Sequence, residues 1–284
     1  MNIRGIIMKI NKVLNNNLVI SNINGKERIV MGNGIAFGKK RGQKLDESKI
    51  EKLFRLTTTE QEKMLALIDE VDDNVVLITE KIIQKANELY ENAISESLYL
   101  SLIDHINFAI ERTKNGYVIK NPLMHEIRKI YPQEYQIGEF GVNLINKEYN
   151  IDIQIDEASF IAMHIVNTNL GESLSNTYEI TKITTRILDL INSYFDLDLL
   201  ETDLNYSRFM THLKFFIQRL INRDPLEEVM DDTLIQILTV RYSEENKCVD
   251  EIAKLLKEEY DHELLNDERG YLILHLARLL KSNM

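Results

Sequence analysis

The sequence predicts a small antiparallel β domain followed by two homologous all-helical domains. Three observations lead to this fold class. Short runs of branched residues and six of the eleven glycines fall within the first 55 residues. Helical periodicity replaces that pattern from about residue 60 onward. Two histidine-containing stretches, 107 residues apart, then share the same residue pattern.

The β domain is expected between Met8 and Phe37. The runs Asn17–Ser21 and Arg28–Met31 are rich in branched side chains, which favour strands. Asn24-Gly25 between them is the strongest short hairpin signal, because both positions of the turn need a positive φ. A piece of about 45 residues buries little core, so we expect it to gain stability from a second copy or from its target.

The helical part begins with Thr59-x-x-Glu62, which has the form of a capping box and predicts a helix start near residue 60. His105 and His212 both fall on apolar helical stripes. The other members of these stripes are Leu98, Leu102 and Ala109 for the first histidine, and Phe209, Phe215 and Phe216 for the second. The segment Asn169–Ser173 breaks the pattern and predicts a junction between two helical domains.

The repeat itself consists of three landmarks in the same order. His-x-x-Phe-x-Ile-x-Arg occupies residues 105–112 and again residues 212–219. Further on, Glu157-x-x-Phe160-Ile161-x-x-His164 matches Glu268-x-x-Tyr271-Leu272-x-x-His275, and Asn121-Pro122-Leu123 matches Asp224-Pro225-Leu226. A unit of about 107 residues is too long for a solenoid repeat and long enough to fold alone, so the landmarks predict a duplicated domain.

Charge is distributed unevenly along the chain. Residues 1–55 hold 12 Lys/Arg and 4 Asp/Glu, a net of +8, so the rest holds 34 − 12 = 22 against 45 − 4 = 41, a net of −19. A compact basic segment predicts an anionic partner, either nucleic acid or an anionic membrane surface. Cys248 is the single cysteine, and no apolar run approaches the roughly 18 residues of a membrane span. We therefore expect a cytoplasmic protein without membrane insertion.

The four repeated histidines, His105, His164, His212 and His275, are candidates for chemistry. A single histidine on an apolar stripe is usually a hydrogen-bonded core residue. Imidazole at four equivalent sites indicates a use for its nitrogen, because it is costly to bury. No two of them show the close spacing of a zinc motif, so no metal is expected. Phosphoryl acceptance fits instead, since a neutral imidazole can attack a phosphoryl donor and gains about two negative charges.

The loop Met31–Arg41 fits RNA binding better than catalysis. Gly32-Asn33-Gly34 with Gly38 lacks the spacing of a dinucleotide loop, and no Walker motif, nucleophile elbow or HExxH is present. We expect neither an enzyme nor a cofactor. Glycines let a backbone approach phosphates, Phe37 offers a stacking face, and the cations of Lys39-Lys40-Arg41 attract the strand. The run Asn15–Asn17 either contacts base edges or forms a plain turn.

These residues resemble the BglG/LicT family of transcriptional antiterminators, from Met8 to the C-terminus. Residues 8–17 (Met-Lys-Ile-x-Lys-Val-Leu-Asn-Asn-Asn) and 31–37 (Met-Gly-x-Gly-Ile-Ala-Phe) are similar to the family's co-antiterminator RNA-binding domain. The repeats are similar to its two phosphotransferase-system (PTS) regulation domains. The resemblance implies an RNA-binding domain at residues 8–62, a first regulation domain at 71–174 and a second at 177–284.

The resemblance also implies a mechanism. A homodimer would bind a hairpin, the ribonucleic antiterminator, in nascent mRNA and prevent terminator formation, so that sugar-utilisation genes, by likeness β-glucoside genes, are transcribed. A sugar-specific PTS permease (EII) would phosphorylate the first regulation domain to switch the protein off, and HPr would phosphorylate the second to switch it on. The expected modification sites are His105, His164, His212 and His275, and the expected RNA-binding residues are Asn17, Gly32, Asn33, Phe37, Gly38 and Lys39.

One position departs from the family pattern, because the family usually has Arg or Lys where this chain has Asn33. The loss of that cation would weaken or redirect RNA recognition. Two other functions stay open. The four histidines alone would suit a phosphohistidine relay, although a relay has no need of the basic segment. A DNA-binding activator with the same regulation domains is the other, although the first 55 residues do not suggest a helix-turn-helix.

Overall fold

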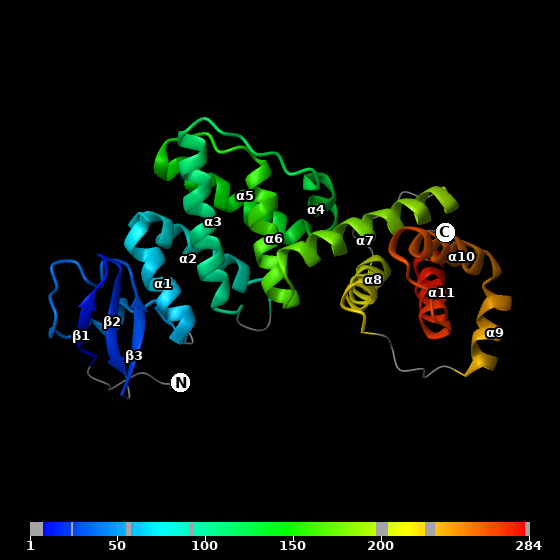
Figure 1. The fold of residues 1–284 in the computed structure, drawn as a ribbon, viewed down its shortest axis with the longest axis horizontal. Helices are drawn as coiled ribbons and strands as arrows, with labels where there is room; N and C mark the ends of the chain where they lie inside the picture. Colours follow the sequence, from blue (N-terminus) through cyan, green and yellow to red (C-terminus); the bar gives the residue numbers. More distant parts are fainter. Residues whose placement is uncertain are drawn as a thin grey trace. The chain divides into compact units, whose positions relative to one another are not determined.

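The computed structural model describes residues 8–23, 25–54, 58–90, 94–196, 204–224 and 231–281. The chain divides into two compact units, Met1–Glu172 and Ser173–Met284. Figure 1 shows strands at the N-terminal end of the first unit and helices through the remainder of both units. The predicted fold class, a small antiparallel sheet followed by helical domains, is confirmed.

The sheet has four antiparallel strands in the order β1-β2-β3-β4. Their bounds are β1 (Ile10–Val13), β2 (Leu18–Ile23), β3 (Lys26–Met31) and β4 (Lys52–Leu53). Ile23 pairs with Lys26 across a two-residue turn, and Gly25 there has a φ of 78°. The predicted hairpin is therefore confirmed, although Asn24 itself lies outside the described residues.

The β domain buries more than its length led us to expect. Eight buried side chains form a cluster on one side of it: Met8, Ile10, Val19, Ile23, Val30, Ile35, Ala36 and Leu45. Leu18 and Ile20 alternate with Val19 along β2 and are buried as well, so β2 is covered on both faces. Phe54, directly after β4, is 1% exposed and meets the ring of Tyr99 edge to face at 4.8 Å. The sheet thus gains apolar burial from the first helical domain.

The first unit contains six α-helices within the described residues. They are α1 (Thr58–Glu70), α2 (Asp73–Asn87), α3 (Ser97–Lys114), α4 (Met124–Ile130), α5 (Pro132–Tyr149) and α6 (Asp156–Leu170). The predicted helix start near residue 60 is confirmed within two residues, because α1 begins at Thr58.

Helices α5 and α6 pack closely because a glycine lies between them. A Cβ added to Gly138 would lie 2.0 Å from the carbonyl oxygen of Ala158, a distance that no side chain tolerates. Helix α6 ends at Leu170, and Gly171 follows in the left-handed conformation with a φ of 68°. The predicted break in helical structure at Asn169–Ser173 is confirmed.

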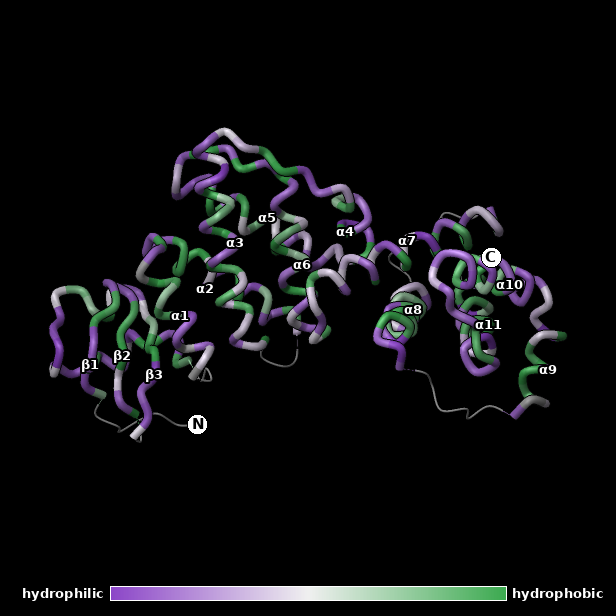
Figure 2. Tube along the Cα trace, in the orientation of Figure 1, coloured by the Kyte–Doolittle hydropathy of each residue, from purple (hydrophilic) through white to green (hydrophobic). Residues whose placement is uncertain are grey.

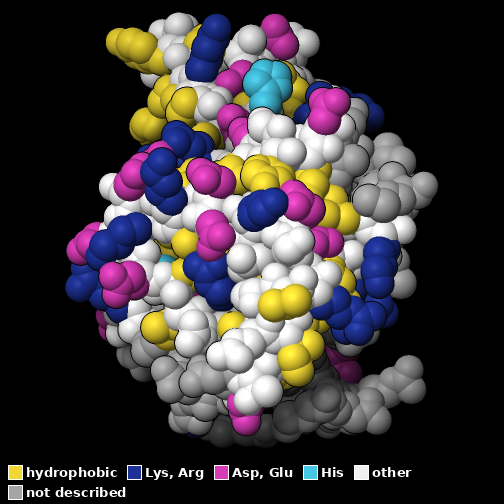
Figure 3. Space-filling view, turned by 90° about the vertical axis from the view of Figure 1, so that its right-hand side faces the viewer, with side chains coloured by type: hydrophobic (Ala, Val, Ile, Leu, Met, Phe, Trp, Pro, Cys, Tyr) yellow, Lys and Arg dark blue, Asp and Glu magenta, His cyan; other side chains and the backbone are white. Residues whose placement is uncertain are grey.

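The second unit contains five α-helices within the described residues: α7 (Leu174–Phe195), α8 (Leu204–Asn222), α9 (Asp232–Arg241), α10 (Ser243–Tyr260) and α11 (Asn266–Lys281). Ser173 caps α7, because its hydroxyl accepts a hydrogen bond of 3.1 Å from the backbone N–H of Asn176. Figure 2 shows hydrophobic and hydrophilic residues alternating along the helices of both units, the pattern of amphipathic helices. On the face drawn in Figure 3, acidic and basic side chains are interspersed among hydrophobic ones.

The predicted apolar stripes are largely confirmed. Leu98, Leu102 and Ala109 are buried, and the side chain of His105 between them is 14% exposed. In the second stripe, Phe209 and Phe216 are buried. The prediction for Phe215 is wrong, because its ring is 52% exposed, like that of its counterpart Phe108 at 57%. No helix within the described residues combines the length and apolar character that a membrane span requires.

Candidate RNA-binding loop and histidine pairs

The loop that follows β3 is anchored by Asn17. The Asn17 side chain is only 6% exposed, and its Oδ1 accepts a hydrogen bond of 2.7 Å from the N–H of Gly34. Its backbone carbonyl accepts another of 3.0 Å from Gly32, and the N–H of Ala36 donates to the carbonyl of Asn16. Oδ1 of Asn15 in turn accepts from the N–H of Asn17 at 2.9 Å. The Asn15–Asn17 run therefore builds a turn that fixes the loop.

Gly32 is required by the packing of the loop. An added Cβ would lie 1.7 Å from the carbonyl oxygen of Lys49, which ends the short 3-10 helix η1 (Glu47–Lys49). Because that neighbour is backbone, it cannot move aside as a flexible side chain would. Sequence reasoning assigned Gly32 to RNA contact and missed this internal constraint. Gly38, by contrast, has open space around its Cβ position and a φ of 67°, so its backbone remains approachable.

The tip of the loop presents the groups that suit a nucleic acid. The Phe37 ring is 76% exposed, and Asn33, Gly38 and Lys39 are exposed beside it in the chain. The backbone N–H of Asn33 donates to Oε1 of Glu51 at 3.3 Å. This bond does not use the Asn33 side chain, whose amide can therefore contact a ligand. An exposed aromatic ring next to cations can stack on an unpaired base while the cations meet phosphates.

A concavity with a volume of about 600 Å³ lies beside this loop. It is lined by Lys39, Lys40 and Arg41 from the loop, and by Asn11, Lys12, Val13, Ile20 and Glu27 from the sheet. Sequence reasoning proposed the loop cations but missed Asn11 and Lys12. The strand pattern carried a signal, because a lysine in the middle of a short strand points out of the sheet.

The first unit brings His105 and His164 together. His105 lies on α3 and His164 on α6, and their ring centroids are 4.9 Å apart. Nε2 of His105 lies 3.1 Å from Oε2 of Glu157, the second residue of α6. The other carboxylate oxygen of Glu157 accepts a hydrogen bond from Arg112. Histidine, carboxylate and guanidinium thus form one cluster that joins α3 to α6.

His164 is the more enclosed member of this pair, at 9% exposure. Burial, and then the neighbouring His105, lower the pKa of His164 to about 3. Burial acts in this direction because a low-dielectric interior disfavours the charged form. His164 is therefore neutral near pH 7, the state in which an imidazole nitrogen is nucleophilic.

The second unit brings the equivalent histidines together. His212 on α8 and His275 on α11 have ring centroids 4.1 Å apart. The hydroxyl of Tyr271 and Nδ1 of His212 are hydrogen-bonded to each other, where the first repeat has Phe160 and no hydroxyl. Burial, then His212 and Arg278, lower the pKa of His275 to about 4. This pair also contains a neutral imidazole near pH 7.

The equivalent glutamate of the second repeat, Glu268, has different partners. Oε2 of Glu268 lies 3.1 Å from Nε2 of His262 and accepts a hydrogen bond of 3.0 Å from the N–H of Leu265. It has no counterpart of the Arg112 contact among the described residues.

Modification of either pair would change the local electrostatics sharply. A phosphoryl group adds about two negative charges at pH 7. On His105 that charge would appear next to the carboxylate of Glu157, inside a cluster that links two helices. Within the described residues, no three His, Cys, Asp or Glu side chains gather as they would around a metal ion.

Comparisons with known proteins agree with this arrangement. The family profile described as "CAT RNA binding domain" matches residues 8–63. The profile described as "PRD domain" matches twice, at residues 80–168 and 185–279. The second profile alone covers more than half of the chain, and its two matches contain the two histidine pairs.

Relatives match over nearly the whole chain. "Transcription antiterminator LicT" of Bacillus subtilis (strain 168) is 40% identical over 276 residues, which cover 96% of this chain and 99% of the relative. "Beta-glucoside operon antiterminator" of Dickeya chrysanthemi is 35% identical over 274 residues, 96% of each chain. The crystal structure titled GlcT CAT-PRDI is 34% identical, has a TM-score of 0.53, and covers 57% of this chain and 97% of its own. The chain therefore belongs to the BglG/LicT family of transcriptional antiterminators.

Proposed function

We propose that this antiterminator acts as a homodimer that binds a hairpin in nascent mRNA and prevents terminator formation. The observation that carries the proposal is that two features occur in one chain. Equivalent histidines are paired in both helical repeats, and the N-terminal domain has a loop with an exposed aromatic ring and neighbouring cations. By likeness to the relatives, whose names describe regulators of transcription, the genes it controls are those for β-glucoside use. A cytoplasmic location follows from such a role.

The proposal divides the chain into three parts. Residues 8–62 bind the RNA hairpin, residues 71–174 form the first regulation domain, and residues 177–284 form the second. RNA contact is assigned to Asn33, Phe37, Gly38 and Lys39 at the surface of the loop. Asn17 and Gly32 also belong to the RNA-binding loop, with their side chain and backbone supporting its shape from inside.

Regulation is assigned to the four paired histidines. A sugar-specific PTS permease would modify His105 and His164, and HPr would modify His212 and His275. The added charge would alter helix packing, and through it the symmetric dimer. A relay would leave the exposed Phe37 and its neighbouring cations without a role, and duplex DNA would offer Phe37 no unpaired base on which to stack.

The RNA arm is tested by titrating the full chain with an antiterminator hairpin and with the same hairpin made of DNA. We expect the RNA to bind with an affinity that falls as salt rises. Phe37→Ala should cost about 1–3 kcal/mol of binding free energy, the usual contribution of one stacked base. Phe108→Ala is the matched control, because Phe108 is also exposed but lies on α3. Equal binding of the DNA version would refute the proposal.

Asn33→Arg sharpens this test. Restoring the cation that the family usually has should add one phosphate contact and steepen the slope of log affinity against log salt by about 1. A slope that does not change would show that residue 33 does not face the RNA backbone.

The regulatory arm is tested by mass spectrometry after incubation with phosphoenolpyruvate, HPr or the permease, and the general PTS enzymes. We expect phosphohistidine on at least one member of each pair. His125 is exposed and lies outside both pairs, so its label provides the background level. Absence of label from all four paired histidines would exclude this form of control.

A further inference from the structure

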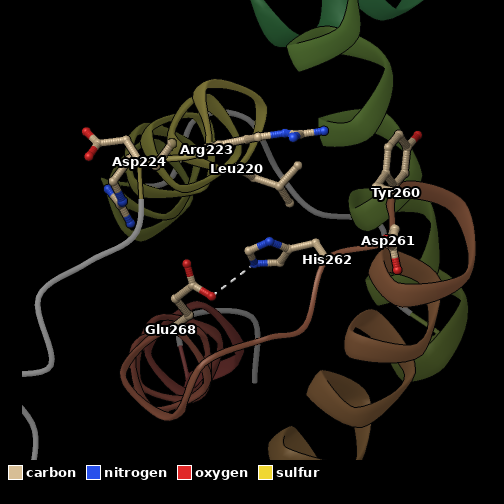
Figure 4. A pocket seen from close by; sticks show the side chains of 8 residues that line it. Leu220, Arg223, Asp224, Tyr260, Asp261, His262 and Glu268 are labelled. Atoms are coloured by element: carbon tan, nitrogen blue, oxygen red, sulfur yellow. Dashed lines mark hydrogen bonds and ion pairs between the residues drawn. The ribbon is translucent and has the colours of Figure 1, made fainter.

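A pocket of about 390 Å³ lies in the second unit, between the end of α8 and the loop that joins α10 to α11. It is lined by Arg219, Leu220, Arg223, Asp224, Tyr260, Asp261, His262 and Glu268. Figure 4 shows Leu220 and Arg223 on α8 and its end, Tyr260 at the end of α10, and His262 joined to Glu268 by the marked contact. None of these residues is a member of a histidine pair.

The first repeat has a smaller pocket at the equivalent place, of about 130 Å³. Arg112, Gly116 and Glu157 line it where Arg219, Arg223 and Glu268 line the larger one. Ile151 lies six residues before Glu157, as His262 lies six residues before Glu268. The second repeat therefore has an arginine in the cavity lining where the first has a glycine. His262 also lines the larger cavity, whereas Ile151, at the corresponding position in the sequence, does not line the smaller one.

These two differences change what the cavity offers. In the first repeat Arg112 is neutralised by Glu157. In the second, Glu268 contacts His262 and the backbone of Leu265, and Arg219 has no ion-pair partner among the described residues. The Nε of Arg219 is buried and makes no hydrogen bond there. Within the described part of the chain, this buried nitrogen therefore lacks the acceptor that a buried donor needs.

Arg223 stands at a position where glycine would be easier to accommodate. Its φ is 54°, and that of Gly116 at the matching turn is 79°. A side chain in the left-handed region is strained, whereas glycine makes the same helix end freely. Arg223 places a second guanidinium, also without an ion pair among the described residues, one helical turn from Arg219 at the exposed mouth of the pocket.

The rest of the lining suits a ligand with hydroxyl groups. Asp224 and Asp261 provide carboxylate oxygens that can accept hydrogen bonds, although Asp261 also meets Lys257 at 3.0 Å. Leu220 and Tyr260 provide apolar surface. The volume falls within the range of about 300–1,000 Å³ that is usual for small-molecule sites. Two arginines suit a phosphate, and the carboxylates disfavour a ligand that is anionic throughout.

We propose that this pocket binds a small phosphomonoester that carries hydroxyl groups, that is, a sugar phosphate. Its phosphate would meet Arg219 and Arg223, and its hydroxyls would meet Asp224 and Asp261. Helix α8 also carries His212, and α11 carries both Glu268 and His275. A bound ligand would therefore tie the end of α8 to the start of α11 and stabilise the packing between the helices that hold the second histidine pair. The inference is independent of RNA binding.

The test is isothermal titration calorimetry of the full chain without RNA, with glucose 6-phosphate as the probe. We expect saturable binding, and affinities for glucose and for inorganic phosphate that are each weaker by about tenfold or more. Inorganic phosphate that binds as tightly as the probe would overturn the assignment to a sugar phosphate. No saturation by any of the three would overturn the site itself.

Two variants locate the binding. Arg223→Gly installs the residue of the first repeat and removes the strained conformation, so the protein should unfold at an equal or higher temperature while affinity falls by about tenfold or more. Arg219→Gln should weaken binding similarly. Arg208→Gln is the matched control, because Arg208 is exposed on α8 outside the pocket, and it should leave affinity unchanged. Undiminished binding by both pocket variants would refute the proposal.

Discussion

The two helical repeats bring equivalent histidines together, but the glutamate near each pair has different partners. Glu157 in the first repeat bridges His105 and Arg112, and so connects α3 with α6 through one charged cluster. Glu268 in the second repeat contacts His262 and the backbone of Leu265. His212 there is hydrogen-bonded to the hydroxyl of Tyr271. One duplicated sequence pattern thus supports two electrostatic arrangements.

This difference determines what a new negative charge meets in each repeat. Next to His105 it meets a carboxylate and a buried ion pair, so the packing of α3 on α6 must respond. Next to His212 it meets a neutral hydroxyl that can donate a hydrogen bond to it. Domains with the same fold can therefore respond differently to the same modification, as opposed regulation by two donors would require.

The largest contrast is expected from removing the glutamates. Glu157→Leu leaves the guanidinium of Arg112, which is 8% exposed, without its partner. This change should lower the free energy of unfolding by about 3–5 kcal/mol. Glu268→Leu removes a histidine contact and the carboxylate that accepts from the N–H of Leu265, and should lower the free energy of unfolding by about 1–3 kcal/mol. Hydrogen exchange by mass spectrometry on the full chain measures both, in α3 and α6 for the first and in α8 and α11 for the second.

The double variant Arg112→Met with Glu157→Leu is the control, because it removes both charges. Replacing a buried pair by apolar side chains is often close to neutral, so most of the lost protection should return. If the two single glutamate variants lost equal protection from exchange, the two repeats would be electrostatically equivalent. That result would contradict the different roles given to Glu157 and Glu268.

Acidification should destabilise both repeats. His164 has a pKa of about 3, and an unfolded histidine has one near 6.5. Above pH 6.5 both states are neutral and His164 adds no pH dependence. Below pH 6.5 the histidine is protonated in the unfolded state but not in the folded state. The free energy of unfolding therefore falls with pH until about pH 3, where the folded state is protonated as well. From pH 7.5 to pH 5 the loss from His164 is about 2 kcal/mol, since each unit is worth about 1.4 kcal/mol.

His275, whose pKa is about 4, should lose nearly the same amount over this interval, because both folded pKa values lie below pH 5. Hydrogen exchange at the two pH values, corrected for the intrinsic rates, should show α6 and α11 weakened to a similar extent. His164→Gln should remove most of the change in α6, whatever it does to stability at pH 7.5. A change in α6 that persists in this variant would assign the acid response to another group.

Part of this comparison was accessible from the sequence. The periodicity around His105 and His212 predicted helices with a buried face, and Asn24-Gly25 predicted the hairpin, because both signals are local and repeat at the spacing of the backbone. The equivalent positions of the four histidines predicted a common use for their nitrogens. Those predictions needed no knowledge of tertiary partners.

The partners themselves were not predictable. Arg112 and Glu157 are 45 residues apart, and His212 and Tyr271 are 59 apart, so no local pattern identifies either contact. Phe215 was assigned to the buried stripe because it is apolar, but an apolar residue at the edge of a helical face stays exposed when no neighbouring helix covers it. Gly32 was read as a binding residue because its close contact, the carbonyl of Lys49, lies 17 positions further along the chain.

Charge substitution at the first histidine of each pair tests the functional side of the comparison. His105→Asp places a carboxylate near Glu157, so it should weaken the packing of α3 on α6 and lower antitermination by about tenfold in a reporter assay. His212→Asp faces the hydroxyl of Tyr271 and should raise antitermination instead. His105→Asn and His212→Asn are uncharged controls of similar size. Changes in the same direction for both aspartates would contradict the opposed roles.

The smallest effect is expected from exchanging the aromatic residues near the two pairs. Tyr271→Phe gives the second repeat the residue of the first and removes one hydrogen bond to His212, which should cost about 0.5–1.5 kcal/mol of local stability in α8 and α11. The reciprocal Phe160→Tyr adds a hydroxyl to a ring whose centroid lies 5.8 Å from that of His105. His105 already faces Glu157, so this change should leave α3 and α6 nearly unchanged. Hydrogen exchange on the full chain resolves both. If Phe160→Tyr stabilised its repeat as much as Tyr271→Phe weakened the other, the hydroxyl alone would account for the difference, and the role given to Glu157 would be unnecessary.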